Sequence, residues 1–300
     1  MNMKKRHVID KAHELFIEQG YHATSIQDIL NRSGISKGSF YNYFSSKGEL
    51  FKAVFNLIQE NVQLERDKLL IGEDIRDMNI FKAQISMMME INKRNKIAQL
   101  IDDVLVSNDL DLIKFIKQFR FFFLHWVYER FIDIFPRDKE IYLVDCTVIF
   151  AGIMQNMLFT SSALKTTITM EKLVDYSMDR IITILDDISA KGVRLFEHEK
   201  LNTLLPQSES NYFFNNEFSI ATSSLKKAVE KSFSIEKQKA ATYLNLLFFI
   251  QEEIMNNKEP RKFLIESALT SLKNSNEFNH LKEYLQYEQI LANMKYYPIS

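Results

Sequence analysis

The sequence contains little glycine, proline or cysteine. Of its 300 residues, seven are Gly, four are Pro and one is Cys. A β-rich protein with many tight turns would normally need more glycine and proline, so the composition favours helices. The single cysteine, Cys146, excludes an intramolecular disulfide and a thiolate zinc cluster and suits a reducing compartment. We expect Cys146 to be a small buried hydrophobe.

Net charge is nearly absent, and long apolar runs are missing. The chain has 38 Lys and Arg against 39 Asp and Glu, a net charge of -1. No overall positive field attracts it to nucleic acid, so a DNA-binding surface would have to be a local patch. No uninterrupted apolar run approaches the roughly 18 residues of a membrane span. The basic start also lacks a long apolar stretch before Asp10, so we expect no secretory signal and a cytoplasmic protein.

The usual signatures of enzymes are missing as well. The sequence contains no GxGxxG, GxxxxGK[ST], GxSxG or HExxH, and its six histidines show no paired spacing for a metal. Because all glycines lie at or before Gly192, the last third has no glycine-rich phosphate loop. We therefore predict that the chain is not an enzyme and has no catalytic residue, no cofactor and no metal site.

Hydrophobic residues, by contrast, make up 46% of the chain, enough for buried cores in two or more domains. Near the N-terminus these residues recur with the 3.6-residue period of helices. Ser25 with Asp28 and Ser46 with Glu49 have capping-box spacing, and Gly34 is typical of a helix end, as is Gly20. The predicted helices cover residues 4–19, 25–33, 36–44 and 46–70.

The rest of the chain continues the helical pattern. Helices are predicted at about 76–91, 93–107, 109–134, 138–163 and 170–190. After a linker-like stretch at 193–217, four more are predicted near 218–232, 234–257, 259–274 and 276–295. The predicted fold is all-α, with a helix-turn-helix domain at 1–58, a larger helical ligand-binding and dimerisation domain at 59–192, and additional helices of unknown role at 193–300.

Residues 25–44 have the parts of a helix-turn-helix, in which the second helix enters the major groove of DNA. Gly34 would allow a left-handed turn, and Ile35 would fill the space between the two helices. Phe40 and Phe44 share a face of the second helix, so we expect them to be buried against Ile29, Leu15 and Phe16. The remaining side chains would point outward and carry groups that bind phosphates and base edges: Lys37, Gly38, Ser39, Tyr41, Asn42 and Tyr43.

Two further observations fit a DNA-binding patch. Gly38 has no side chain, so the backbone there could approach DNA closely. Residues 1–55 contain eight Lys or Arg and five Asp or Glu, which gives this segment a modest positive charge in the expected place.

The stretch SKGSFYNYFSSKGEL, from Ser36 to Leu50, resembles the DNA-binding domain of the TetR family of repressors. Supporting matches are AHELF at 12–16, Gly20-Tyr21 and Thr24-Ser25-Ile26. The resemblance covers residues 1–58 and continues, at the level of helix order, to about 191. It implies phosphate contacts by Thr24 or Ser25 and by Ser36, Tyr41, Tyr43 and Lys47, and base contacts by Lys37, Gly38, Ser39 and Asn42.

Three details of this resemblance concern chemistry. Asn42 could hydrogen-bond adenine through both of its amide atoms. Lys47 lies at a helix N-terminus, where the helix dipole also favours a phosphate. Gly48 departs from the acidic residue commonly found at that position in the family.

The resemblance also implies a ligand pocket in the middle region. Apolar residues cover more than one face of the aromatic stretch 115–135, so we expect that helix to be buried nearly all round. In the family, helices of this region enclose a small molecule. Ordinary core packing explains each of these residues as well, and the candidate lining residues are Met87, Phe119, Phe122, Phe123, His125 and Trp126.

Helices 138–163 and 170–190 correspond to the pair that forms the dimer bundle in the family. Ala151 and Gly152 would allow helices to approach closely there. Core packing explains the same apolar pattern, and the candidate interface residues are Ile141, Val148, Met154, Leu158, Leu173, Ile181 and Ile184.

The predicted function is that of a DNA-binding transcriptional regulator. The first hypothesis is a repressor that binds a pseudo-palindromic operator as a homodimer, with recognition helices about 34 Å apart, and that is released by a small-molecule ligand. The alternative is a DNA-binding adaptor whose C-terminal helices bind a protein partner and which has no small-molecule inducer. Predicted partners are double-stranded DNA, an unknown ligand and a second copy of the chain, with no membrane.

Overall fold

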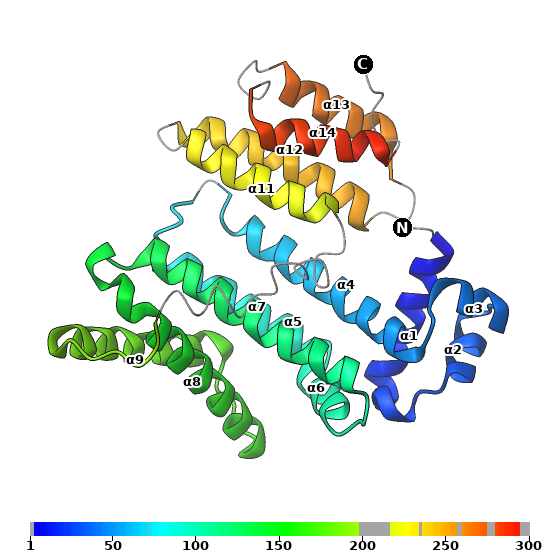
Figure 1. Cartoon of the computed structure of the whole chain (residues 1–300), viewed down its shortest axis with the longest axis horizontal. Coiled ribbons are helices and arrows are strands. Elements are labelled where there is room, and N and C mark those ends of the chain that lie inside the picture. The colour runs from blue at the N-terminus through cyan, green and yellow to red at the C-terminus, as the bar shows by residue number, and fades with distance from the viewer. Residues whose placement is uncertain are drawn as a thin grey trace. The chain divides into compact units, whose positions relative to one another are not determined.

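The structure is a computed structural model that describes residues 3–71, 73–197, 217–233, 236–256, 260–274 and 280–294. Within these residues every regular element is a helix (Figure 1). The predicted all-α class is therefore confirmed. The predicted linker at 193–217 lies largely outside the described residues, as do a few predicted helix ends in the last third.

The first four helices agree closely with the sequence pattern. They are α1 (Met3–Ala23), α2 (Ile26–Ser33), α3 (Lys37–Tyr43) and α4 (Lys47–Lys68). The first helical run ends at Gly20, as predicted, although the range of α1 extends beyond it. Gly20 leaves helical geometry, with φ 84° and ψ 168°, but helical turns resume and end at Ala23. The glycine therefore stops the first helical run and kinks the chain before the last turn of α1.

The middle helices are α5 (Met78–Arg94), α6 (Ile97–Leu105), α7 (Leu110–Ile134), α8 (Leu143–Ala163) and α9 (Met170–Lys191). A 3₁₀ helix, η1 (Arg137–Tyr142), replaces the first turn and a half of the helix predicted from 138. Such tight turns are common at the start of α-helices. The last helices are α11 (Glu217–Ser232), α12 (Lys237–Asn256), α13 (Lys262–Lys273) and α14 (Lys282–Asn293).

The chain folds as two compact units. The N-terminal unit comprises Met1–Val62 and Asp74–Glu209, and the C-terminal unit comprises Gln63–Glu73 and Ser210–Ser300. Helix α4 therefore starts in the N-terminal unit, and its last residues belong to the C-terminal unit. The C-terminal unit overlaps the predicted region 193–300 but also takes in this short, much earlier segment.

The N-terminal unit has a core between α5, α7, α8 and α9. Its centre is aromatic: the Phe81 ring lies 5.5 Å from that of Phe131 and 5.9 Å from that of Phe150. Cys146 is fully buried, as predicted, and burial raises the pKa of its thiol to about 11. Three of the predicted interface residues are part of this core instead, because their side chains fill the space between these helices: Met154, Leu173 and Ile181.

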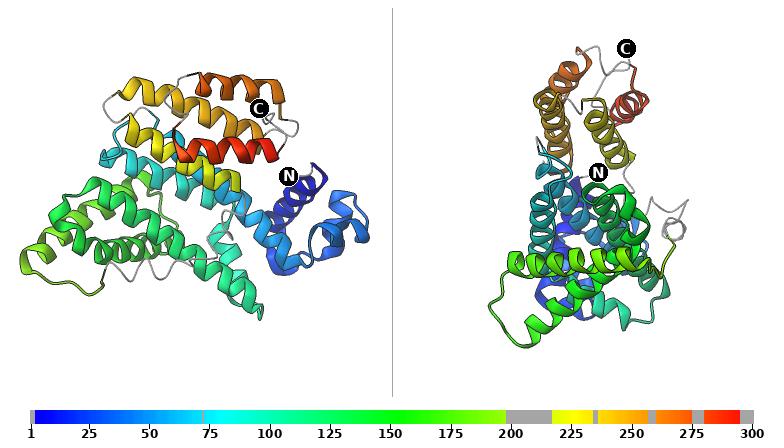
Figure 2. Two further views of the ribbon diagram at one scale, coloured as in Figure 1. Left: turned by 45° about the horizontal axis from the view of Figure 1, so that its top comes forward. Right: turned by 90° about the vertical axis from the view of Figure 1, so that its left-hand side faces the viewer.

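The C-terminal unit has a core of its own. Helices α11 to α14 run with similar axes, and the right-hand view of Figure 2 shows them nearly end-on. Tyr287 stacks on Phe218 in this core, with ring centroids 5.6 Å apart. The buried Lys226 ammonium lies 3.1 Å from the Asp67 carboxylate and donates to the Gln251 side chain at 2.8 Å. This contact fixes the end of α4 to α11 and α12.

One segment of the described residues, Arg137–Ala163, is long and apolar enough to cross a membrane by length and composition. A third of its most apolar stretch is buried inside the protein. Core helices of soluble proteins meet the same criterion, and α8 contributes Phe150 and Met154 to the core described above.

Candidate DNA interface

Helix α2 and the turn after it are fixed by their own polar groups. The Ser25 hydroxyl accepts the backbone N–H of Asp28 at 3.1 Å, and the Asp28 carboxylate accepts the backbone N–H of Ser25 at 2.8 Å. This is the predicted capping box. Gly34 follows the helix with φ 67° and ψ 24°, the left-handed conformation that glycine adopts readily. The angle at which α3 leaves α2 is thereby set.

The recognition helix α3 is anchored by two phenylalanines. Ser36 begins it by accepting the backbone N–H of Ser39 at 3.1 Å. Phe40 and Phe44 are both buried, with ring centroids 5.8 Å apart, as the sequence predicts. Leu15, Phe16 and Ile29 are buried in the same domain. Because one face of α3 is used for packing, the other face is available to DNA.

The available face of α3 carries small and polar groups. Lys37, Gly38 and Asn42 are exposed, and Tyr41 is 47% exposed. Ser39 and Tyr43 are half-buried. A Cβ atom added at Gly38 would meet only the Ser36 hydroxyl, at 3.9 Å, so nothing inside the protein requires glycine there. Glycine within a helix costs about 1 kcal/mol relative to alanine. Its presence therefore points to close approach by something outside the domain.

The structure separates the two candidates at the start of α2. Thr24 is fully buried, and its hydroxyl donates to the carbonyl oxygen of Gly20 at 2.7 Å. Ser25 is exposed. A side-chain contact with phosphate is therefore open to Ser25, whereas the Thr24 hydroxyl is used inside the domain.

Lys47 has a structural role that the sequence did not predict. Its ammonium donates to the carbonyl oxygens of Tyr21 and Thr24, both at 2.9 Å, and lies 4.2 Å from the centroid of the Tyr21 ring. Burial lowers the pKa of Lys47. Two of its three N–H donors thus hold the loop between α1 and α2, which leaves one for a phosphate.

Gly48 is explained by its neighbours. A Cβ atom there would lie 3.3 Å from the Asp109 carboxylate and 3.6 Å from Leu112. An acidic side chain at this position would face a second carboxylate, and like charges at that distance repel each other. The departure from the family's usual residue therefore follows from the start of α7 beside it.

Two hydrogen bonds between Asp103 of α6 and the kink in α1 are not indicated by the sequence. The Asp103 carboxylate accepts a hydrogen bond from the backbone N–H of Tyr21 at 2.9 Å. The backbone carbonyl of Asp103 accepts a second one from His22 Nε2 at 2.7 Å. A Cβ atom on Gly20 would be only 2.9 Å from the same carboxylate. The partners are more than eighty positions apart, so no local pattern indicates the contact.

Helix α4 connects the DNA-binding domain with α7 through aromatic rings. Phe51 packs against Tyr21 at 5.0 Å, inside the DNA-binding domain. One turn later, Phe55 packs against Phe119 of α7 at 4.8 Å. Lys52, between them, forms ion pairs with Glu49 and with Asp111 at the start of α7. Contacts of α4 therefore link α7 with Tyr21 of α1 in the DNA-binding domain.

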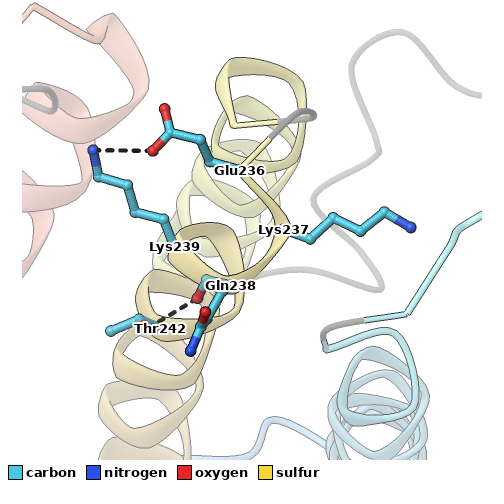
Figure 3. A pocket seen from close by; sticks show the side chains of 5 residues that line it. All are labelled: Glu236, Lys237, Gln238, Lys239 and Thr242. Carbon is cyan, nitrogen blue, oxygen red and sulfur yellow. Dashed lines mark hydrogen bonds and ion pairs between the residues drawn. The ribbon is translucent and has the colours of Figure 1, made fainter.

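The residues predicted to line a ligand pocket are half-buried, and their role in ligand binding stays a prediction. These are Met87, Phe119, Phe122, Phe123, His125 and Trp126. The expectation that α7 is buried nearly all round is wrong, because Lys114, Lys117 and Arg120 are exposed along it. An open hollow of about 590 Å³ lies at the start of α12, and Figure 3 shows the side chains that line it, among them Glu236 paired with Lys239. None of the residues that line it is a predicted ligand residue.

Comparison with known proteins shows what kind of domain the N-terminal residues form. Residues 8–54 match the family described as "Bacterial regulatory proteins, tetR family". The HTH-type transcriptional regulator YuxN of Bacillus subtilis (strain 168) is 22% identical over 96% of this chain and 98% of its own length. YerO of the same organism, also an HTH-type transcriptional regulator, is 21% identical over 92% of each chain.

A third relative matches a shorter stretch. The HTH-type transcriptional repressor DhaR of a Mycobacterium species (strain GP1) is 30% identical over 28% of this chain and 44% of its own length. No solved structure matches the chain significantly. The matches to YuxN and YerO include the C-terminal helices, and all three relatives are named as transcriptional regulators. The chain therefore carries a TetR-type DNA-binding domain at residues 8–54 and is similar over nearly its whole length to HTH-type transcriptional regulators.

Proposed function

We propose that the protein is a repressor that binds a pseudo-palindromic operator as a homodimer and is released by a small-molecule ligand. The observation that carries the DNA-binding part is the outer face of α3, which presents Lys37, Gly38, Tyr41 and Asn42 on a helix anchored by buried rings. The sense of regulation rests on DhaR, which is named a repressor.

The contacts divide into two kinds. Phosphates are bound by hydroxyl groups and by the remaining N–H of Lys47, and base edges are read by Lys37, Gly38, Ser39 and Asn42. The residues proposed for phosphate contact are Ser25, Ser36, Tyr41, Tyr43 and Lys47. Thr24 is left out because its hydroxyl is buried and already bonded.

The proposed dimer interface lies on the outer faces of α8 and α9. Phe159 is 74% exposed, and Val148 and Tyr176 are also exposed. A Cβ atom on Gly152 would meet nothing within 4 Å, so a second helix could approach closely there. Of the residues predicted for this interface, Ile141, Val148, Leu158 and Ile184 are not fully buried and remain candidates. A second copy would cover the apolar surface of α8 that a lone chain leaves in water.

Ligand release is proposed to act through α4. A ligand between α5 and α7 would have to bind the released state better than the DNA-bound state, or it would change nothing. The contacts of Phe55 with α7 and of Phe51 with Tyr21 of α1 give such a difference a path into the DNA-binding domain. A regulator of this kind acts in the cytoplasm, where it meets bacterial DNA.

DNA binding is tested by selecting duplexes from a random-sequence pool with the full-length chain. Binding of the selected duplex is then measured for Tyr41→Ala and Lys37→Ala at several salt concentrations. Both variants should bind more weakly, and Lys37→Ala, which removes a base-reading side chain, should also discriminate less between the selected duplex and altered sequences. Lys117→Ala, which removes an exposed lysine of α7, serves as the control and should bind like the wild type. Binding that is indifferent to both α3 variants and to salt would contradict the proposal.

A thermal-shift screen with apolar and cationic compounds separates the ligand-controlled repressor from the adaptor. Compounds that raise the melting temperature should also release the selected duplex. If none stabilises the protein and a protein partner co-purifies with it, the adaptor is favoured instead.

A further inference from the structure

Part of the positive charge of the DNA-binding domain lies at the starts of its helices. Four of the eight Lys and Arg within residues 1–55 form ion pairs with carboxylates of the same segment, at 2.7–3.1 Å: Arg6 with Asp10, Lys11 with Glu14, Arg32 with Glu18 and Lys52 with Glu49. The Lys47 ammonium is directed at backbone carbonyls. Outside these ion pairs, lysines of the segment lie in the first turn of three helices: Lys5 in α1, Lys37 in α3 and Lys47 in α4.

Lys5 lies beside the recognition helix. Its ammonium is 5.1 Å from the centroid of the Phe44 ring. Phe44 is the C-cap of α3, and its ring lies 6.4 Å from that of Tyr43. Lys5 is half-buried, on the helix face that also carries the buried Val8 and Ile9. A lysine in such a place covers apolar surface with its stem and keeps its charge near the solvent.

We propose that Lys5 binds a backbone phosphate of the operator, next to the segment that α3 reads. This inference rests on the proposed DNA-binding function and extends the interface to the start of α1. Phosphates border the groove that a recognition helix enters, and lysine binds them as a point charge. The Phe44 ring holds the ammonium at the C-terminal end of α3 before DNA arrives.

The test separates charge from packing. Lys5→Met keeps an apolar stem over Phe44 and removes the charge, whereas Lys5→Arg keeps the charge. Lys11→Met is the matched control, because Lys11 lies on the same helix and is paired with Glu14. The probe is the duplex selected by the full-length chain, and the readout is the salt dependence of its binding.

Each phosphate contact contributes about 0.9 to the slope of log affinity against log salt concentration. A homodimer loses two such contacts in Lys5→Met, so its slope should be shallower by about 1.8. Between about 50 and about 200 mM salt, the variant should then lose about tenfold less affinity than the wild type. Lys5→Arg and Lys11→Met should keep the wild-type slope.

Phosphate ethylation interference gives an independent readout. One phosphate in each half-site should be sensitive to ethylation with the wild type and insensitive with Lys5→Met. If Lys5→Met keeps both the salt slope and the interference pattern while Lys37→Ala weakens binding, the inference about Lys5 is overturned and DNA binding stands. If the wild-type chain selects no duplex, the proposed function itself fails.

Discussion

Replacing Lys47 by alanine should destabilise the N-terminal unit as well as weaken DNA binding. The substitution removes two hydrogen bonds from a charged donor to the carbonyls of Tyr21 and Thr24, and a cation–π contact with the Tyr21 ring. Hydrogen bonds to charged groups contribute about 1.5–3 kcal/mol each when buried. Lys47 is half-buried, and burial lowers its pKa, which opposes part of that gain. We expect a net loss of about 2 kcal/mol, or about thirtyfold in the folded-to-unfolded ratio.

Urea unfolding followed by tryptophan fluorescence measures this loss. The chain has a single tryptophan, Trp126, on α7 of the N-terminal unit, where it packs 5.7 Å from Phe81. Its signal therefore reports on that unit and not on the C-terminal one. Lys37→Ala is the control, since Lys37 is exposed and its loss should weaken DNA binding without changing stability.

Two results would refute this account of Lys47. If Lys47→Ala unfolds at the wild-type urea concentration but no longer binds DNA, its ammonium acts on phosphate and not on the loop. If Lys47→Ala loses neither stability nor affinity, the carbonyl contacts contribute nothing measurable.

Further substitutions at Glu60, Phe159 and Gly20, two of them with a control variant, have defined outcomes. Burial raises the pKa of Glu60 to about 7. The folded state therefore holds this proton more tightly, and unfolding free energy should fall by up to about 3 kcal/mol between about pH 4.5 and 7. Glu60→Gln should flatten that pH profile, and an unchanged profile would contradict the assignment. Phe159→Glu should convert the dimer to monomers, as measured by light scattering. The control is Phe263→Glu, at a residue of α13 that is 67% exposed, and it should stay dimeric. If Phe159→Glu is dimeric as well, the α8 interface is excluded. Gly20→Ala should destabilise by about 2 kcal/mol, because φ 84° is strained for alanine. Gly38→Ala is the control: it should leave stability in urea unchanged or slightly raised, yet impair DNA binding. If Gly20→Ala and Gly38→Ala are equally stable, backbone strain at position 20 is contradicted.

The parts of the site that sequence predicts are those fixed by short-range chemistry. Ser25 and Asp28 cap α2 because they are three positions apart, and Gly34 adopts the left-handed turn that its neighbours require. Phe40 and Phe44 are buried because they share one face of a short helix. The family comparison depends on the same local stretch.

The parts that sequence misses depend on distant partners. Asp103 binds a backbone N–H of the kink in α1, and a backbone group has no residue type that a pattern could reveal. Lys47 was expected to face phosphate, but which N–H groups stay available depends on loop carbonyls that come close only in the fold. Periodicity also overstated the burial of α7, since it locates apolar side chains without showing what covers them.

The contact between Lys226 and Asp67 has a consequence for how the chain can be divided. Asp67 is made early in translation, but its partner follows only after the whole polypeptide between Glu73 and Ser210 has been synthesised. Until then the end of α4 lacks the helices against which Ile71 packs. In a chain that ends before residue 210, the end of α4 would lack these packing partners permanently. The packing around the end of α4 is thus completed by helices from the last third of the chain, which is made last.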